Sequence, residues 1–267
     1  MSRHARTAAA GRQRGISLFI VLVMVLLVTL LVLHGSRTAL FNEMITGTDS
    51  DYQRALEAAQ AMVRDAELDL MGRRPDGSPC GSGPDSAFGN CRPSDGLRSN
   101  IDIANKKVYF PPPGDGGEFD YLQSQLASKT PSCVAGACIA PAGGTSPTAT
   151  AFWQDTTTFE TMKGVAATYG QYTGAKAEDA AAGATEDGDE IDNPLLATGT
   201  PRAWYWIEPL RYQTSDSNAS RELAPVGGDV SASASGIVYR ITAVAQGLKP
   251  GTLAVIQTVF VRRQVSG

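Results

Sequence analysis

The feature that most constrains this chain is an uninterrupted apolar run near its N-terminus. From Ile16 to Leu33 the only polar residues are Ser17 and Thr29, and the run holds no proline, glycine or charge. Its 18 residues approach the roughly 20 that a helix needs to cross the hydrocarbon core of a bilayer. Since every interior backbone group of such a helix bonds within the helix, the run predicts a transmembrane helix over residues 16–33.

The charges around the run predict its orientation and exclude one class of partner. Residues 1–15 hold four of the 23 basic residues and no acidic residue. Basic flanks stay on the cytoplasmic side of a membrane, so the remainder of the chain is expected in the periplasm. Beyond residue 15, 19 basic and 27 acidic residues give a net charge of −8. An acidic body of this kind argues against nucleic acid as a partner.

The helix is predicted to continue beyond the membrane. No proline occurs before Pro75, and Gly72 is suited to end a helix. Gly47 is the one expected weak point. We therefore expect one long helix over residues 16–72, transmembrane over 16–33 and amphipathic over 37–72. Apolar residues recur at intervals of three or four, and they are Tyr52, Leu56, Ala59, Val63, Ala66 and Leu70. The expected opposite, polar face consists of Asp51, Arg54, Glu57, Arg64, Asp65 and Asp69.

Residues 73–267 are expected to form one globular domain. Glycine, proline, serine and threonine predict loops up to about residue 200, apart from a short strand at Lys107–Phe110 and a turn of helix at Tyr121–Leu126. β-Branched and aromatic residues predict firmer strands over residues 203–210, 236–245 and 253–262. A hairpin-length connection between the last two predicts an antiparallel sheet. One face of that sheet would pack on the amphipathic part of the helix, which gives an α+β fold.

All four cysteines lie beyond the apolar run, and their even number suits an oxidising compartment. The simplest of the three connectivities joins neighbours, Cys80 to Cys91 and Cys133 to Cys138. A zinc site is disfavoured because the spacings differ from those of zinc-binding cysteine pairs.

Calcium is the one metal that the residue pattern raises. Residues 175–193 are acidic, and Asp187, Asp189 and Asp192 supply clustered carboxylates. The segment lacks the full EF-hand pattern, so a solvated acidic loop is the favoured interpretation and no cofactor is expected. The two histidines, His4 and His34, lie outside the predicted globular domain. A histidine-based catalytic triad cannot form there, and we do not expect an enzyme.

The junction of Arg14 and Gly15 with the apolar run resembles the leader junction of type IV prepilins. The resemblance implies that residues 1–15 are a leader, that prepilin peptidase cleaves between Gly15 and Ile16, and that Ile16 is then N-methylated. Ile16 departs from the Phe or Met that begins most mature pilins. Five further segments are similar to PilX-like minor pilins of type IV pili, namely Arg37–Gly47, Arg54–Glu67, Pro201–Glu208, Tyr239–Ala243 and Ala254–Phe260.

Ile20 stands at the fifth mature position, where most pilins carry glutamate. A carboxylate in lipid is expensive, so that glutamate needs a cationic partner, thought to be the N-terminal amine of the preceding subunit. Ile20 needs no cationic partner, which suits the first subunit of a new pilus. The resemblance likewise implies a minor pilin that helps to prime pilus assembly and lies at or near the pilus tip.

The resemblance also implies partners and a location. The partners would be other minor pilins, the major pilin, prepilin peptidase, the inner-membrane assembly platform and a large tip adhesin. The chain would lie in the inner membrane before assembly and at the pilus tip afterwards. Two alternatives stay open. One is a K-type minor pseudopilin of a type II secretion system, which also lacks the glutamate. The other is a single-pass membrane-anchored periplasmic binding protein, which would retain residues 1–15.

Overall fold

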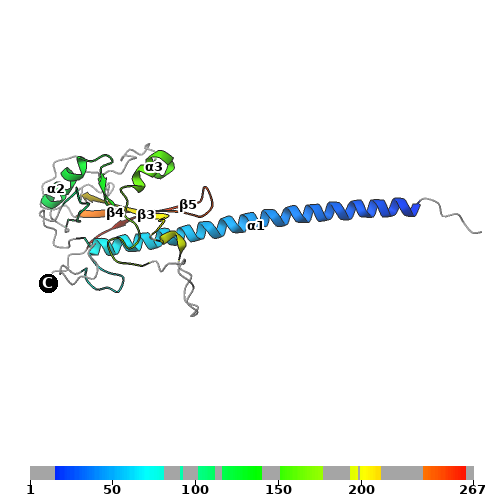
Figure 1. The fold of residues 1–267 in the computed structure, drawn as a ribbon, viewed down its shortest axis with the longest axis horizontal. Helices are drawn as coiled ribbons and strands as arrows, with labels where there is room; N and C mark the ends of the chain where they lie inside the picture. The colour runs from blue at the N-terminus through cyan, green and yellow to red at the C-terminus, as the bar shows by residue number, and fades with distance from the viewer. Residues whose placement is uncertain are drawn as a thin grey trace, which may run out of the picture. The chain divides into compact units, whose positions relative to one another are not determined.

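The computed structural model describes residues 16–80, 91–92, 102–111, 116–139, 151–176, 193–197, 199–211 and 237–262. The chain divides into two compact units, Met1–Asp49 and Ser50–Gly267. Helix α1, Ile16–Met71, contributes residues to both (Figure 1). It is helical at Gly47, so the expected weak point does not interrupt it.

Helix α1 ends at the glycine that the sequence indicated. Gly72 adopts a left-handed conformation with φ of 60°. The Gly72 amide donates to the carbonyl of Asp69 at 3.1 Å, and the Arg73 amide donates to that of Leu68 at 3.0 Å. This pair of bonds is a Schellman motif, which satisfies carbonyl groups of the last turn and stops the helix.

The second unit is built on a five-stranded sheet in the order β1-β2-β3-β4-β5. The long strands are β3 (Ala203–Arg211), β4 (Ile237–Gln246) and β5 (Leu253–Phe260), which pair antiparallel. They match the three predicted strands to within two residues at each end. The short hairpin of β1 (Cys133–Val134) and β2 (Ala137–Cys138) was not predicted, and β2 runs parallel to β3.

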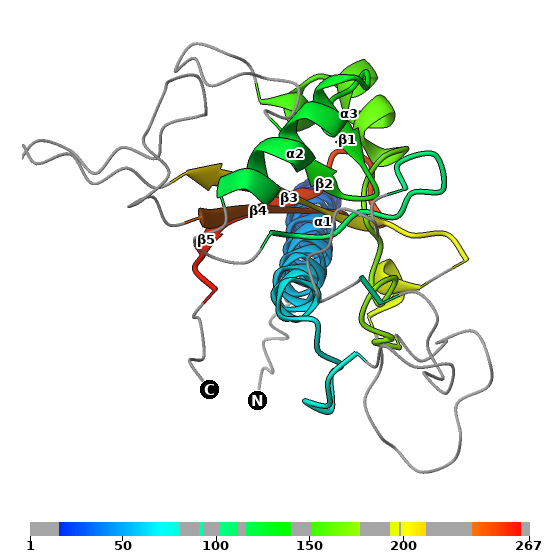
Figure 2. The same ribbon diagram turned by 90° about the vertical axis from the view of Figure 1, so that its left-hand side faces the viewer.

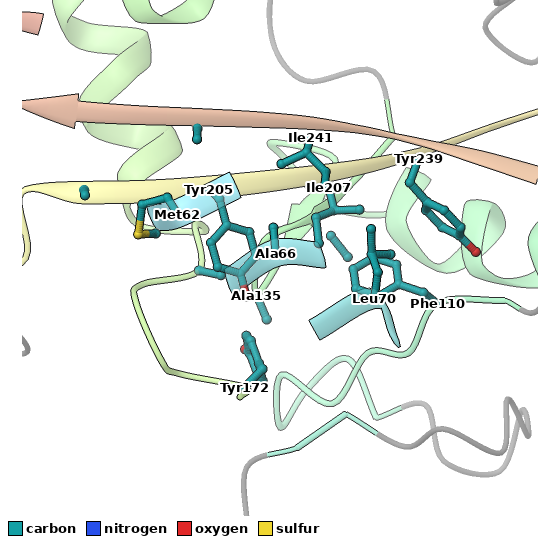
Figure 3. Close-up of a cluster of buried hydrophobic side chains, with 14 of the residues drawn as sticks. Met62, Ala66, Leu70, Phe110, Ala135, Tyr172, Tyr205, Ile207, Tyr239 and Ile241 are labelled. Atoms are coloured by element: carbon teal, nitrogen blue, oxygen red, sulfur yellow. The ribbon is translucent and has the colours of Figure 1, made fainter. Parts of the chain in front are cut away.

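One face of the sheet packs on α1, which confirms the predicted α+β arrangement. Met62 and Ala66 of α1 lie against Tyr205 and Ile207 of β3, with Ile241 of β4 beside them (Figure 3). All five side chains are fully buried. Small residues at Ala55, Ala58 and Ala59 belong to the same core, and their size lets the helix approach the strands closely.

The opposite face of the sheet is also covered, which the sequence did not predict. Helices α2 (Gly116–Ala127) and α3 (Thr156–Lys163) lie on the side of the sheet away from α1 (Figure 2). Trp206 of β3 packs there against Phe152, Phe159 and Met162, and its indole donates to the Met162 carbonyl at 3.1 Å. Two short 3-10 helices, Phe152–Gln154 and Pro194–Leu196, complete the described elements.

Two local predictions were wrong or too short. Lys107–Phe110 is not a strand, because its backbone pairs only at the isolated bridge between Asp102 and Lys107. Val108, Tyr109 and Phe110 are buried as core side chains instead, just before three prolines that cannot extend a ladder. The single turn expected at Tyr121–Leu126 is part of the 12-residue helix α2.

Candidate functional site: the exposed and buried stretches of helix α1

The first stretch of α1, residues 17–49, exposes its apolar side chains. Leu18 exposes 73% of its surface and Leu31 71%. Among the described helices, α1 is the one whose length and composition suit a membrane span, and none of its most apolar window is buried within the protein. Apolar surface exposed on this scale requires lipid or other protein chains around it.

Polar groups within this stretch are satisfied inside the helix. The Thr29 hydroxyl donates to the carbonyl of Leu26 at 2.8 Å, and the Thr38 hydroxyl donates to that of His34 at 3.1 Å. The Thr48 hydroxyl donates to the carbonyl of Met44 at 2.8 Å. Because these hydroxyls are already hydrogen-bonded, their transfer into an apolar environment carries little free-energy cost.

The exposed apolar surface extends past the predicted membrane span. Leu40, Phe41, Met44 and Ile45 are each exposed by 59–66%. Their spacing of one, three and one residues places them on one side of the helix. An apolar stripe of this kind beyond the lipid marks a surface for contact with other chains.

The residues predicted for processing lie at the start of this stretch. Helix α1 begins at Ile16, and Ile20 is an exposed apolar residue of its second turn. Gly15 and the predicted leader lie outside the described residues. Cleavage after Gly15 and methylation of Ile16 therefore stay predictions.

The second stretch of α1, residues 50–71, buries three carboxylates that the sequence placed on a polar face. Asp51, Asp65 and Asp69 expose 2–4% of their surface, whereas Tyr52, predicted to be apolar and inward, exposes 46%. Of the six residues predicted to face inward, Ala59, Ala66 and Leu70 are buried. The prediction was wrong for Tyr52 and for the three aspartates. The buried series runs Asp51, Ala55, Ala58, Met62, Asp65 and Asp69, with intervals of four and three residues.

Asp51 binds the turn that joins β4 to β5. Its carboxylate accepts hydrogen bonds from the backbone amides of Leu248 at 2.8 Å and Lys249 at 2.9 Å. Burial opposes ionisation of Asp51, but these backbone hydrogen bonds outweigh it and its pKa lies below the ordinary value. The carboxylate therefore fixes the hairpin turn to the helix.

Asp69 forms a buried ion pair with Arg92. The Arg92 Nε lies 2.9 Å from Oδ1 and 2.8 Å from Oδ2 of Asp69, and the Tyr205 hydroxyl donates to Oδ2 at 2.9 Å. The guanidinium carbon lies 3.7 Å from the centre of the Tyr172 ring and 4.8 Å from that of Phe110. Burial raises the pKa of Asp69, while the charge and hydrogen bonds of Arg92 act against that rise.

Asp65 is buried, and none of the ion pairs among the described residues includes it. It accepts a hydrogen bond from the Gly170 amide at 2.8 Å and another from the Thr173 hydroxyl. Burial raises its pKa to about 6, and the nearby charge of Asp69 adds to the rise. The charge state of Asp65 therefore changes at a higher pH than that of an ordinary aspartate.

Both disulfides join neighbouring cysteines. Cys80 pairs with Cys91, immediately before Arg92, and Cys133 pairs with Cys138 across β1 and β2. The second disulfide belongs to the core on the far face of the sheet, beside Trp206. The first tethers the segment that carries the buried arginine.

No metal site is found in the part of the chain that the structure describes, where no group of three or more His, Cys, Asp or Glu side chains converges. The calcium candidates Asp187, Asp189 and Asp192 lie outside the described residues. His34 is an exposed residue of α1.

Sequence reasoning missed Arg92 entirely. It lies in a segment rich in glycine, proline and serine, where no periodic pattern distinguishes one polar residue from the next. The buried carboxylates did carry a signal, because acidic residues recur there at the intervals of an inward helix face. Two aspartates one turn apart in such a series indicate a buried cationic partner elsewhere in the chain.

Comparison with known families supports the order of these elements. Residues 14–64 match the PilX N-terminal family model, and residues 134–262 match the model of the C-terminal region of type IV pilus assembly protein PilX. The two matches include most of α1 and the three long strands. No curated protein and no solved structure matches the chain.

Proposed function

The chain belongs to the PilX family of type IV pilus assembly proteins, and we propose that this minor pilin helps to prime pilus assembly and lies at or near the pilus tip. Residues 1–15 act as a prepilin leader, and residues 73–267 form the periplasmic head. Prepilin peptidase cleaves after Gly15 and methylates Ile16, which is the first residue of α1. The mature chain keeps the whole exposed apolar stretch of the helix.

Ile20 is the observation that carries the priming role. It is an apolar, exposed residue within the membrane-spanning part of α1, at the position where most pilins have glutamate. A glutamate there holds a charge in a medium of low dielectric and needs a neighbouring cation before the subunit leaves the bilayer. Isoleucine removes that requirement, so the subunit can leave before any other pilin is in place.

The exposed stretch of α1 supplies the contact surface for partners. In the membrane, residues 16–33 contact lipid and the assembly platform. In the filament, the stripe containing Phe41 and Met44 packs on helices of other minor pilins and the major pilin. The head then lies at the tip, where a large adhesin is the expected further partner.

Replacement of Ile20 by Glu tests the priming role. The test is made in a strain in which deletion of this chain abolishes pili. We expect Ile20→Glu to reduce the number of pili at least severalfold, while Ile20→Leu retains them. Membrane fractionation of both variants checks that insertion is unchanged, since one Glu at this depth does not prevent insertion of such an apolar helix. Normal piliation with Ile20→Glu would refute the role assigned to Ile20.

A further inference from the structure

The two disulfides differ in how accessible they are. Cys133 and Cys138 expose 2% and 0% of their surface and lie in the core on the far face of the sheet. Cys80 exposes 8%, and its partner Cys91 is half-buried. Accessible disulfides exchange with thiols more readily than enclosed ones, because a thiolate has to reach one of the sulfurs. Cys91 is therefore the cysteine that a reductant in solution reaches first.

Cys80 is fixed to the end of helix α1. Its amide donates to the Gly72 carbonyl at 2.8 Å, and the Gly72 amide in turn donates to the carbonyl of Asp69 at 3.1 Å. The disulfide joins this fixed point to Cys91, which directly precedes Arg92. The backbone of Arg92 is thereby tied to the same turn of α1 that carries its ionic partner.

Arg92 connects segments that are distant in sequence. Its guanidinium pairs with Asp69 of α1, donates to the Ala135 carbonyl at 2.6 Å and lies 3.7 Å from the centre of the Tyr172 ring. Ala135 and Tyr172 belong to the core that packs on α1 (Figure 3). The three segments are therefore held together by one side chain, and only while the backbone of Arg92 stays in place.

The disulfide keeps that backbone in place. Cys91 lies 11 residues from Cys80 along the chain. Without the S–S bond, this longer stretch of chain would be the connection between Arg92 and the end of α1. Seating the guanidinium beside Asp69 would then also cost the entropy of closing the loop. The buried ion pair should accordingly depend on the disulfide.

We propose that Cys80–Cys91 is a site of thiol–disulfide exchange that works as a redox-sensitive clamp on Arg92. The oxidised form holds Arg92 against Asp69, and reduction by a dithiol releases it. Release also removes the stacking partner of Tyr172, so the loop of residues 168–175 loosens. The proposal goes beyond the priming role and does not depend on it, because both redox forms are measured on the purified chain.

The exchange balances between the chain and the dithiol. A thiolate of the dithiol attacks Sγ of Cys91, the bond to Cys80 breaks, and Cys80 leaves as a thiolate that takes up a proton. The second thiol of the dithiol then displaces Cys91 and closes a disulfide within the reductant. The chain gains two electrons and two protons, and the dithiol loses them. An oxidant that carries a disulfide reverses both steps.

The first test maps which disulfide is reduced in the folded chain. The full chain in detergent micelles is treated with dithiothreitol, quenched with iodoacetamide at intervals and analysed by peptide mass. We expect Cys80 and Cys91 to be labelled at least about tenfold faster than Cys133 and Cys138. Equal rates for the two pairs, or no labelling of Cys80 and Cys91 before the chain unfolds, would overturn the proposal.

Hydrogen exchange with and without dithiothreitol tests the release of Arg92. The Gly170 amide donates to Asp65 at 2.8 Å within the loop of residues 168–175. After reduction it should exchange at least about tenfold faster, because the loop opens locally. The Leu248 amide, bound to Asp51, is the matched control and should change by no more than about twofold. Unchanged exchange at Gly170, or an equal increase at both amides, would overturn the proposal.

Arg92→Met separates the release of Arg92 from the loss of the cross-link itself. In this variant the Gly170 amide should already exchange faster, and reduction should add no more than about twofold. Arg92→Lys is the second variant, for use if Arg92→Met does not fold, because lysine keeps the charge but lacks the planar group that stacks on Tyr172. If reduction still accelerates exchange at Gly170 as strongly as in the unaltered chain, the disulfide acts without Arg92 and the proposal is wrong.

Discussion

The two stretches of helix α1 differ in how their side chains are accommodated. Residues 17–49 present Leu18, Phe41 and similar apolar groups outward, and they bury no carboxylate. Residues 50–71 bury Asp51, Asp65 and Asp69 in the second unit. One continuous helix therefore has a stretch whose surroundings must come from outside the chain and a stretch whose partners all lie within it.

Because of this difference, we expect the second stretch to determine the stability of the fold and the first stretch to determine assembly with other subunits. Each of the three buried aspartates in the second stretch accepts hydrogen bonds from loops that are far away in sequence, such as Arg92 for Asp69 and Gly170 for Asp65. Changes there should affect the free energy of unfolding. Changes in the first stretch should leave that free energy nearly constant and act on membrane insertion or on contacts with other subunits.

The largest effect is expected from Arg92→Met, which leaves Asp69 buried without its cation. Breaking a buried pair in this way costs about 3–5 kcal/mol. Denaturant unfolding of the full chain in micelles measures the loss. The double variant Arg92→Met with Asp69→Asn should recover part of it, because the uncompensated charge is gone. A loss below 1 kcal/mol for Arg92→Met would contradict the assignment of Arg92 as the essential partner of Asp69.

A smaller, pH-dependent effect is expected at Asp65. Its folded-state pKa of about 6 lies above the ordinary aspartate value of 3.8, so between about pH 4 and pH 6 the folded state holds a proton that the unfolded state has released. The free energy of unfolding therefore falls as the pH rises through this window. A difference of about two pKa units corresponds to about 3 kcal/mol.

Asp65→Asn should remove that component, because asparagine does not titrate yet still accepts from Gly170 and donates to Thr173. Unfolding of both proteins at pH 4.5, 5.5 and 7 gives the two slopes, and the difference between them is the prediction. If the slopes are identical, Asp65 does not titrate in this window.

Asp51→Ala should cost about 1–3 kcal/mol, because two backbone amides of the β4–β5 turn lose their acceptor. Hydrogen exchange locates the effect, which should be concentrated at Leu248 and Lys249. Asp49→Ala, which alters an exposed carboxylate two residues earlier, is the control. Equal exchange at Leu248 in all three proteins would show that Asp51 does not fix the turn.

The smallest effect on stability is expected from Phe41→Ala. Phe41 is exposed by 63%, so its removal should change the free energy of unfolding by no more than about 0.5 kcal/mol. Leu70→Ala, at a residue exposed by 1%, should cost about 2–5 kcal/mol. Piliation should fall with Phe41→Ala despite its normal stability. Similar losses of stability for both variants would remove the distinction between the two stretches.

The sequence was sufficient for features that depend on neighbours along the chain. The apolar run and Gly72 predicted α1, and the β-branched segments predicted β3, β4 and β5. It was insufficient where contacts join distant segments. Ala59, Ala66 and Leu70 were correctly assigned to the inward face of α1. That face is wider than predicted, because the aspartates were interpreted as solvated. They are buried only because Arg92, Gly170 and Leu248 return to the helix.

The second covered face of the sheet was missed for a similar reason. Phe159 and Met162 occupy a short helix in which half of the residues are threonine, so its pattern alone does not indicate a buried element. Trp204 and Trp206 did indicate that this face is apolar, since aromatic residues of this size are seldom left in water. Because this apolar face of the sheet points away from α1, a second layer of structure had to cover it.

The mature N-terminus tests the central claim most directly. The chain is isolated from membranes of a strain that expresses it with its prepilin peptidase, and its intact mass and N-terminal sequence are determined. The account predicts a chain that begins at Ile16 and carries one additional methyl group on the amine. A chain that retains Met1 or Ser2, or one that begins beyond Leu33, would contradict it.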